Sequence, residues 1–359
     1  MILDRRAFHR ALLGAFVVPA VGCARRDTSD SPHRALYLLD DETRQDRVLA
    51  GARQEGTVVI YTSLNTQDSV PLTSAFEERY GVKTELWRSS SEGVVQRAVA
   101  EAGAGRFACD VVETNGPEVE ACFREGLLER FHSPQFTDLA PAAFPDHRYY
   151  VADRFNFFTI AYNTDLVPPA EVPSSYDDLL HQRFKGRLGL EAGDVDWFGA
   201  MVTHMGEEKG LAFFGRLAES QPQIRSGHTL MGQVVASGEI AVAANIYNHN
   251  AERLAVQGAP IRWKALEPTF GRPNSIGVAR RAQHPHAALL FADFLLSHEG
   301  QTILKDHNRV PSSRAVSSNL NDFPFEVIDP LITLDEHEKW STIWSDLFLK
   351  GQRVPRDVA

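Results

Sequence analysis

The chain has 359 residues, 43% of them hydrophobic, which is enough to bury a large core and to form roughly two domains. Its formal net charge is −10 at pH 7. An acidic surface repels phosphate backbones, so the composition argues against a nucleic-acid partner.

The N-terminus has the pattern of an export signal. Arg5 and Arg6 precede an apolar run at 11–21 that is too short to span a membrane. The Arg-Arg-x-Phe order resembles the twin-arginine signal, and Cys23 ends a segment that resembles a bacterial lipobox. We expect residues 1–22 to be removed and the mature periplasmic protein to carry a lipid on Cys23. Ala20 stands where leucine is commonest in such a lipobox, so release as a free periplasmic protein remains the alternative.

The composition of the next segment and the placement of the cysteines give two further predictions. Residues 23–46 are polar and rich in Asp, Arg and Ser, which predicts a tether. Cys109 opens a predicted strand, and Cys122 lies in the helix that returns antiparallel to it. That geometry places their Cα atoms beyond the roughly 7 Å limit for a disulfide. Both are therefore expected to be free, buried thiols.

Strands and helices are predicted to alternate from residue 48 onward. β-Branched apolar runs predict strands at 57–61, 82–87 and 110–113, and helical apolar spacing predicts helices at 71–80, 89–102 and 117–125. Pro71 is expected to open the first helix, and Ser89 with Glu92 has the pattern of a capping box for the second. This order predicts a mostly parallel sheet with helices on both faces.

A second set of elements follows a strand predicted at 157–162. The chain is expected to cross into a second lobe near the proline-rich stretch at 167–173. The elements predicted there are strands at 187–190 and 240–244 and helices at 198–205, 210–218 and 229–237. A returning strand is predicted at 275–279 and an apolar helix at 286–296.

Polar side chains follow the predicted strand ends, where parallel sheets bind their ligands. Hydroxyl and backbone N–H groups there could donate to an oxygen-rich ligand, although Ser, Thr and Asn are also ordinary helix caps. The candidates are Thr62, Ser63, Ser90, Ser91, Thr114, Asn115, His228 and Thr229.

Two aromatic residues are further candidates. Trp197 and Tyr247 follow predicted strands of the second lobe, so both could line the same crevice, with core packing as the alternative. The chain has no His-Glu-x-x-His motif, nucleophile elbow, phosphate loop or dinucleotide fingerprint. A zinc enzyme or an exported hydrolase is therefore disfavoured, and no catalytic residues or cofactors are expected.

In order and spacing, several segments resemble the type 2 periplasmic substrate-binding proteins of ABC importers, nearest to the ferric-iron-binding group. These segments are 55–63, 75–83, 110–112, 161–164, 184–190, 238–241 and 291–301. The resemblance implies an α/β clamshell whose lobes are mostly parallel sheets flanked by helices, joined by crossing hinge strands. It implies one lobe at 47–160 and 275–359 and another at 161–274.

The resemblance also implies what the protein does. A monomeric binding protein would capture a solute without chemistry and deliver it to ABC permease and ATPase subunits in the inner membrane. Ferric-binding relatives hold iron through adjacent tyrosines after the strand that ends here at Ala244. This chain has Tyr247 but places Asn248 and His249 where a second tyrosine is expected.

The solute stays open between two classes. Ferric iron prefers phenolate and carboxylate oxygens, so Tyr247 and Glu92 are the metal candidates, with Asp, Glu, His or an external anion completing the shell. A small organic or phosphorylated anion at the hydroxyl-rich strand ends is the alternative, and a cation such as a polyamine or thiamine ranks behind. A ligand sensor for a signalling receptor could use the same clamshell.

Overall fold

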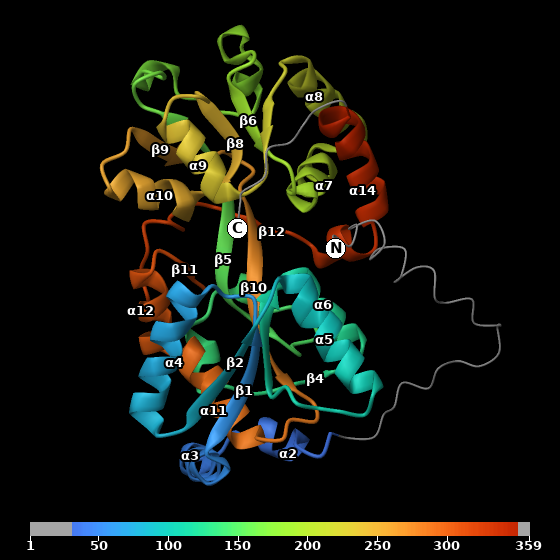
Figure 1. Cartoon of the computed structure of the whole chain (residues 1–359), viewed down its shortest axis with the longest axis vertical. Helices are drawn as coiled ribbons and strands as arrows, with labels where there is room; N and C mark the ends of the chain where they lie inside the picture. The colour runs from blue at the N-terminus through green and yellow to red at the C-terminus, as the bar shows by residue number, and fades with distance from the viewer. Residues whose placement is uncertain (1–30, 351–359) are drawn as a thin grey trace, which may run out of the picture. The chain divides into compact units, whose positions relative to one another are not determined.

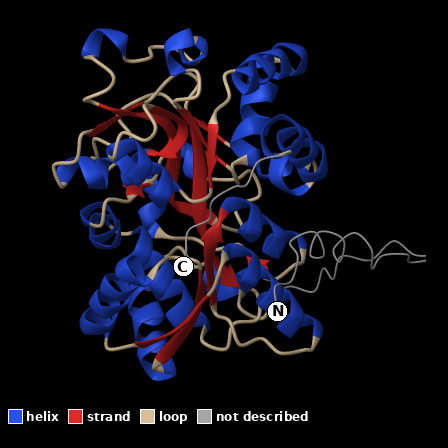
Figure 2. Ribbon diagram, turned by 45° about the horizontal axis from the view of Figure 1, so that its top comes forward, coloured by secondary structure: helices blue, strands red, loops and turns tan. Residues whose placement is uncertain are grey.

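The computed structural model describes residues 31–350. The export signal at 1–22, Cys23 and the first part of the predicted tether lie outside the described residues. Within the described range, no helix has both the length and the apolar composition that crossing a bilayer requires. Figure 2 shows the strands running through the middle of this part, with helices on either side.

The first group of strands is parallel, as the sequence predicted. In sheet order they are β2 (Lys83–Arg88), β1 (Thr57–Thr62) and β3 (Val111–Asn115). Each is followed by a helix: α4 (Thr66–Tyr80) after β1, α5 (Ser91–Gly103) after β2 and α6 (Gly116–Arg124) after β3. Because the strands are parallel, the N-termini of the three helices meet at one edge of the sheet.

Two of these helices begin at residues other than those predicted. Helix α4 begins at Thr66, where the Asn65 side chain accepts a hydrogen bond of 3.1 Å from the Asp68 amide. Pro71 therefore lies inside the helix rather than at its start. The asparagine cap satisfies a free amide of the first turn, which outweighs the proline signal.

The capping box predicted for α5 is wrong by one residue. Ser90, not Ser89, is the N-cap, and its hydroxyl accepts a hydrogen bond of 3.2 Å from the Gly93 amide. Glu92 consequently lies in the first turn as an exposed carboxylate near the positive end of the helix dipole, not as the reciprocal partner of the cap.

A second parallel group forms the other end of the sheet. Its strands, in sheet order, are β8 (Val242–Tyr247), β6 (Leu188–Glu191) and β7 (Gln223–Arg225). Its helices are α7 (Val195–Met205), α8 (Glu207–Glu219), α9 (His228–Ala236) and α10 (Asn248–Val256). The predicted elements of this region are all present, with ends shifted by a few residues.

Two long antiparallel strands join the groups. β5 (Val151–Asn163) and β10 (Phe270–Ala279) run side by side (Figure 1). In their register, Phe158 lies opposite Phe270. β10 pairs with β3 and β5 pairs with β8, both antiparallel. Short strands β4 (Leu128–Glu129), β9 (Ile261–Lys264), β11 (Val310–Pro311) and β12 (Glu326–Val327) pair along β5 and β10. The sheet is therefore mixed.

Two large hydrophobic clusters fill the described structure. The first core contains Phe76 and Phe294 and is covered by α3 (Arg44–Glu55), α11 (Pro285–Leu296) and α12 (His298–Asp306). The second core contains Trp197 and Phe214. Strand β5 contributes Phe155 and Phe157 to the first core and Phe158 and Ile160 to the second.

The predicted tether extends less far than residue 46. Helix α2 (Arg34–Tyr37) buries Tyr37 completely in the first core, and the tyrosine hydroxyl donates to the Ala279 carbonyl at 3.0 Å. Arg44 pairs with Asp293 at 2.6 Å. One aromatic side chain and one ion pair therefore fix a segment whose overall polarity predicted no packing.

The C-terminal segment also packs differently from its predicted grouping. It comprises α13 (Pro330–Leu334), α14 (His337–Trp344) and a π-helical turn at Ser345–Leu349. Trp340, Trp344 and Phe348 lie in the second core, although the sequence grouped 275–359 with the first lobe. The apolar face that these side chains form is buried against α7 and α8.

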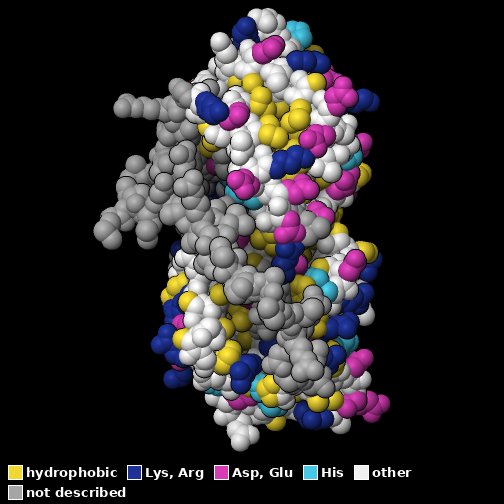
Figure 3. Space-filling view, turned by 90° about the vertical axis from the view of Figure 1, so that its right-hand side faces the viewer, with side chains coloured by type: hydrophobic (Ala, Val, Ile, Leu, Met, Phe, Trp, Pro, Cys, Tyr) yellow, Lys and Arg dark blue, Asp and Glu magenta, His cyan; other side chains and the backbone are white. Residues whose placement is uncertain are grey.

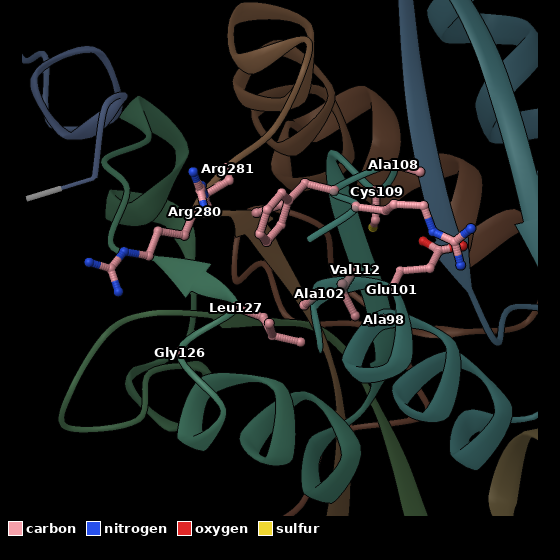
Figure 4. A pocket seen from close by; sticks show the side chains of 13 residues that line it. Ala98, Glu101, Ala102, Ala108, Cys109, Val112, Gly126, Leu127, Arg280 and Arg281 are labelled. Atoms are coloured by element: carbon pink, nitrogen blue, oxygen red, sulfur yellow. The ribbon is translucent and has the colours of Figure 1, made fainter. Parts of the chain in front are cut away.

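Cys109 and Cys122 are free and buried, as predicted. They belong to a smaller apolar cluster with Val112 and Leu128. Cys109 also lines a pocket of about 50 Å³, shown in Figure 4, with Arg280 and Arg281 among its other lining residues.

A buried polar network crosses the middle of the sheet. The Arg154 guanidinium on β5 contacts carboxylate oxygens of Glu113 and Asp153 at 2.6 Å each, and donates to the Asn274 side chain at 2.7 Å. Arg154 is only 3% exposed. The network ties β3, β5 and β10 together where the two groups of strands meet.

Candidate functional site

Tyr247 lies at the end of β8, where its phenol oxygen accepts a hydrogen bond from Arg272 of β10. The Arg272 guanidinium also contacts both carboxylate oxygens of Asp196 at the start of α7, with 2.6 Å between Nε and Oδ2. Burial raises the pKa of Tyr247 well above its ordinary value, and the charge of Arg272 acts in the opposite direction. The arginine therefore links the phenol to a carboxylate.

Two more carboxylates lie beside this pair. Asp194 accepts a hydrogen bond of 3.0 Å from the Asn245 side chain and lies 3.4 Å from Arg272. Glu191 accepts from the backbone amides of Gly193 at 2.6 Å and Gly227 at 2.8 Å. Burial raises the pKa of Asp194 well above its ordinary value, because desolvation disfavours the charged carboxylate.

His228 completes the cluster at the start of α9. Its Nδ1 accepts from the Tyr247 backbone amide at 3.3 Å, so Nε2 carries the proton and faces Asp194 Oδ1 at 3.3 Å. Burial lowers the pKa of His228 to about 4, so the ring is neutral at pH 7. Glu191, Asp194 and His228 each offer one ligand atom, and these atoms lie within 4.8 Å of one another.

Further acidic groups approach from α5 and α6. Burial and, to a smaller extent, the nearby Glu92 carboxylate raise the pKa of Glu118 to about 7. Glu118 also interacts electrostatically with Arg272 and Asp196, and α6 packs against β10, the strand that carries Arg272. One Glu118 oxygen is buried and has no hydrogen-bond partner among the described residues.

The predicted hydroxyl residues divide into two sets. Thr114 donates to Ser63 at 3.1 Å, and Asn115 donates to Ser91 at 2.8 Å, so these four meet where α4, α5 and α6 begin. Thr62 is buried and donates to Glu113 instead. Ser90 is occupied as the cap of α5, and Thr229 is exposed on α9.

Trp197 and the two residues that follow Tyr247 make other contacts. Trp197 is fully buried in the second core and packs edge-on against Phe214, with ring centroids 5.6 Å apart. Asn248 is buried and donates to the Leu320 carbonyl at 2.6 Å. His249 Nε2 lies 2.9 Å from Arg309 Nη1. Asn248 is therefore held by a partner outside the Tyr247 cluster, whereas the His249 ring also stacks near the Tyr247 ring, with centroids 5.5 Å apart.

Sequence reasoning missed most of the charged residues that surround Tyr247. They are Glu118, Glu191, Asp194, Asp196 and Arg272. Asp194 and Asp196 both follow the end of a strand, as the hydroxyl candidates do, and this position is a signal that could have identified them. Arg272 had no such signal, because it lies within a strand far along the chain.

Comparison with known proteins shows the family. Residues 115–335 match the model of the bacterial extracellular solute-binding proteins. Iron uptake protein A1 of Synechocystis sp. is 22% identical over 293 residues, covering 75% of this chain and 80% of that protein.

Two solved structures show the same fold. Iron-bound HitA of Pseudomonas aeruginosa has a TM-score of 0.69 at 18% identity, covering 81% of this chain and 99% of that one. AfuA of Actinobacillus pleuropneumoniae, with exogenous fructose-6-phosphate bound, has a TM-score of 0.66 at 22% identity, and the match covers 82% of this chain and 99% of the AfuA chain. The predicted resemblance is confirmed. The chain belongs to the bacterial extracellular solute-binding protein family, and it is a non-enzymatic, periplasmic solute-binding component of ABC import.

Proposed function

We propose that two lobes close on the solute around β5 and β10 as hinge strands. The proposal rests on the cores: β10 contributes Ile276 and Val278 to the first core and Phe270 to the second, and β5 is divided in the same way. One lobe would comprise 47–160 and the elements from 275 through α12, and the other would comprise 161–274 together with α13, α14 and the turn at Ser345–Leu349. Bending of two strands is the motion that such an arrangement permits.

The solute that the Tyr247 cluster supports best is ferric iron. Asp194 and Asp196 contact the Arg272 guanidinium, and Glu118 interacts with it electrostatically. Two further carboxyl groups lie close by: Glu191 beside Asp194, and Glu92 near Glu118. This excess of negative groups around a phenol is the observation that carries the proposal, because Fe(III) is a hard cation that prefers such oxygen ligands. A trivalent cation would offset the repulsion that these carboxylates exert on one another.

We assign roles to particular residues. Tyr247 would supply the phenolate, and Glu191, Asp194 and His228 are the set whose ligand atoms already lie close together. Before His228 Nε2 could bind iron, its proton would have to move to Nδ1, which would give up the hydrogen bond from the Tyr247 amide. Arg272 holds the phenol oxygen in the structure, so iron binding would require the guanidinium to release it. Glu92 and Glu118 would close on the metal from α5 and α6, with an external anion filling any remaining position.

Iron loading of the purified mature protein tests this proposal. Iron-free protein titrated with ferric citrate should develop a visible phenolate-to-iron charge-transfer band, and native mass spectrometry should show a single iron. Tyr247→Phe should lose the band. Absence of both the band and the iron in the unaltered protein would overturn the assignment.

A small phosphorylated or organic anion is the second candidate. The observation in its favour is the pairing of Ser63 with Thr114 and of Ser91 with Asn115 where the N-termini of α4, α5 and α6 meet. Helix N-termini and hydroxyls bind phosphate oxygens. The structure of AfuA contains such a solute, fructose-6-phosphate. Calorimetry with fructose-6-phosphate and inorganic phosphate would decide: binding in iron-free protein, weakened by Ser91→Ala, would favour the anion.

Localisation and partners follow from the same role. We propose that Cys23 carries a lipid that tethers the monomeric protein to the membrane, where it delivers its solute to permease and ATPase subunits. The lipobox-like segment at 20–23 supports the tether.

A further inference from the structure

A cavity of about 320 Å³ shares Arg272 and Asp196 with the candidate site, but its lining includes neither Tyr247 nor His228. Its walls come from the start of α6, the segment 142–145, strands β5 and β10, and the segment 327–330. The cavity is therefore lined by α6 of the first group and by Asp196 of α7 in the second group. It lies against β10, one of the two strands that join the groups.

The walls of the cavity are mostly apolar. Ala143, Phe144 and Ile328 line it, together with prolines that include Pro117 and Pro273. Pockets that hold small organic molecules begin at about 300 Å³, and a cavity of about 150 Å³ already binds benzene. The size and the lining therefore suit a ring system larger than benzene.

A buried hydroxyl at the cavity wall provides an independent sign of a ligand. Ser275 lines the cavity from β10 and is 1% exposed. Its Oγ has no hydrogen-bond partner among the described residues. A buried hydroxyl without a partner is unfavourable, so a guest with one donor group would satisfy it.

The charged residues that line the cavity, Arg272 and Asp196, argue for a neutral ligand. Arg272 is already matched by both oxygens of Asp196. The other polar lining group, the Tyr150 hydroxyl, donates to Glu120 at 2.9 Å. A charged guest would lose its hydration without gaining a counter-ion.

We infer that this cavity binds a small neutral aromatic molecule that carries one hydrogen-bond donor, with the ring among the apolar walls and the donor at Ser275 Oγ. Arg272 faces the cavity and already lies over the Phe158 ring at 4.9 Å, so its guanidinium is placed to contact an aromatic guest as well. The inference does not depend on the identity of the transported solute.

Indole and indene are probes of matched shape, because indole has an N–H donor where indene has none. Ligand-observed NMR titration of iron-free protein should show saturable binding of both, with indole about fivefold tighter, which is what one neutral hydrogen bond contributes. Because iron is absent, failure here leaves the iron proposal intact. Absence of saturable binding by either probe, or equal affinities, would overturn the inference.

Two variants locate the probe. Ser275→Ala should bind indole as weakly as indene. Ser69→Ala removes a hydroxyl on α4 that is likewise buried and has no partner within 31–350, and it should leave the difference unchanged. Ala143→Leu extends a side chain into the cavity and should reduce the affinity for both probes by at least tenfold. Unchanged affinity in Ala143→Leu protein with a normal melting curve would place the probe elsewhere.

Discussion

The imidazole of His228 stacks on the phenol ring of Tyr247, with ring centroids 3.6 Å apart and planes inclined by 24°. The stack directs the phenol oxygen away from His228 and toward Arg272. Tyr247 is therefore held by a ring on one face and by a guanidinium at its oxygen, while it remains 8% exposed.

Tyr247→Phe should abolish the iron charge-transfer band and weaken ferric citrate binding by at least tenfold, because phenylalanine offers no phenolate. The apo melting temperature should stay within a few degrees, since the ring stack is retained. Tyr176→Phe is the matched control: that tyrosine is buried in the second core, and its hydroxyl donates to the Pro268 carbonyl at 3.2 Å. A large apo destabilisation by Tyr247→Phe alone would assign Tyr247 to the core.

Glu118 should make stability fall as pH rises. Burial raises the pKa of Glu118 to about 7 from an ordinary value of 4.5, so the folded protein holds this proton more tightly than the unfolded chain. The favourable contribution of this proton to the free energy of unfolding is fully present below the ordinary pKa of 4.5 and is lost as pH rises through 7. Glu118→Gln removes this titration.

Urea unfolding at pH 4 and pH 8 measures this effect. Relative to the unaltered protein, Glu118→Gln should gain roughly 1–3 kcal/mol between the two pH values. Glu125→Gln, at an exposed position that ends the same helix, should show no such difference. Equal behaviour of the two variants would mean that Glu118 titrates normally.

Arg154→Met should cost about 3–5 kcal/mol of unfolding free energy, because it leaves Glu113 and Asp153 as buried carboxylates without a counter-ion. Arg183→Met, which breaks a partly exposed pair with Glu171, should cost less than about 1 kcal/mol. Adding Glu113→Gln to Arg154→Met should recover part of the loss. Denaturant titration of all three variants measures these losses of unfolding free energy. Similar losses for Arg154→Met and Arg183→Met would contradict the prediction.

Gly116→Ala should separate α6 from β10. A Cβ atom at Gly116 would lie 2.8 Å from the Pro273 ring, so the substitution should destabilise the fold by about 1–3 kcal/mol. A Cβ atom at Gly103 would meet no atom of the described part of the chain within 4 Å, so Gly103→Ala should be neutral or slightly stabilising. Thermal unfolding of both variants makes the comparison, and a neutral Gly116→Ala would show that the two elements move apart at little cost.

Cys23→Ser should release the protein from the membrane fraction into the soluble periplasmic fraction, because the serine side chain cannot be acylated by the lipoprotein pathway. Cys122→Ser, at a buried thiol, should leave fractionation unchanged. Immunoblots of fractionated cells measure this, and retention of Cys23→Ser protein in membranes would refute the lipid tether.

Local sequence signals were sufficient for most of the element order. The β-branched run at 57–61 and the apolar spacing at 286–296 each gave the right element type, because strand and helix periodicity reflect burial of one face or one stripe. Helix starts were less predictable. Asn65 and Ser90 compete with the neighbouring signals of Pro71 and Ser89, and only hydrogen-bond geometry selects between them.

What the sequence by itself determined is the family, the alternation of strands and helices, and Tyr247 as a candidate ligand at a strand end. Only the tertiary structure decided that Arg272 reaches Tyr247, that Glu118 approaches Arg272, and that Trp340 joins a core formed around Trp197. Local patterns depend on neighbours a few residues apart, whereas these contacts join residues from 25 to more than 150 positions apart. Such contacts depend on how β5 and β10 bring the two groups of strands together, and no local periodicity encodes that arrangement.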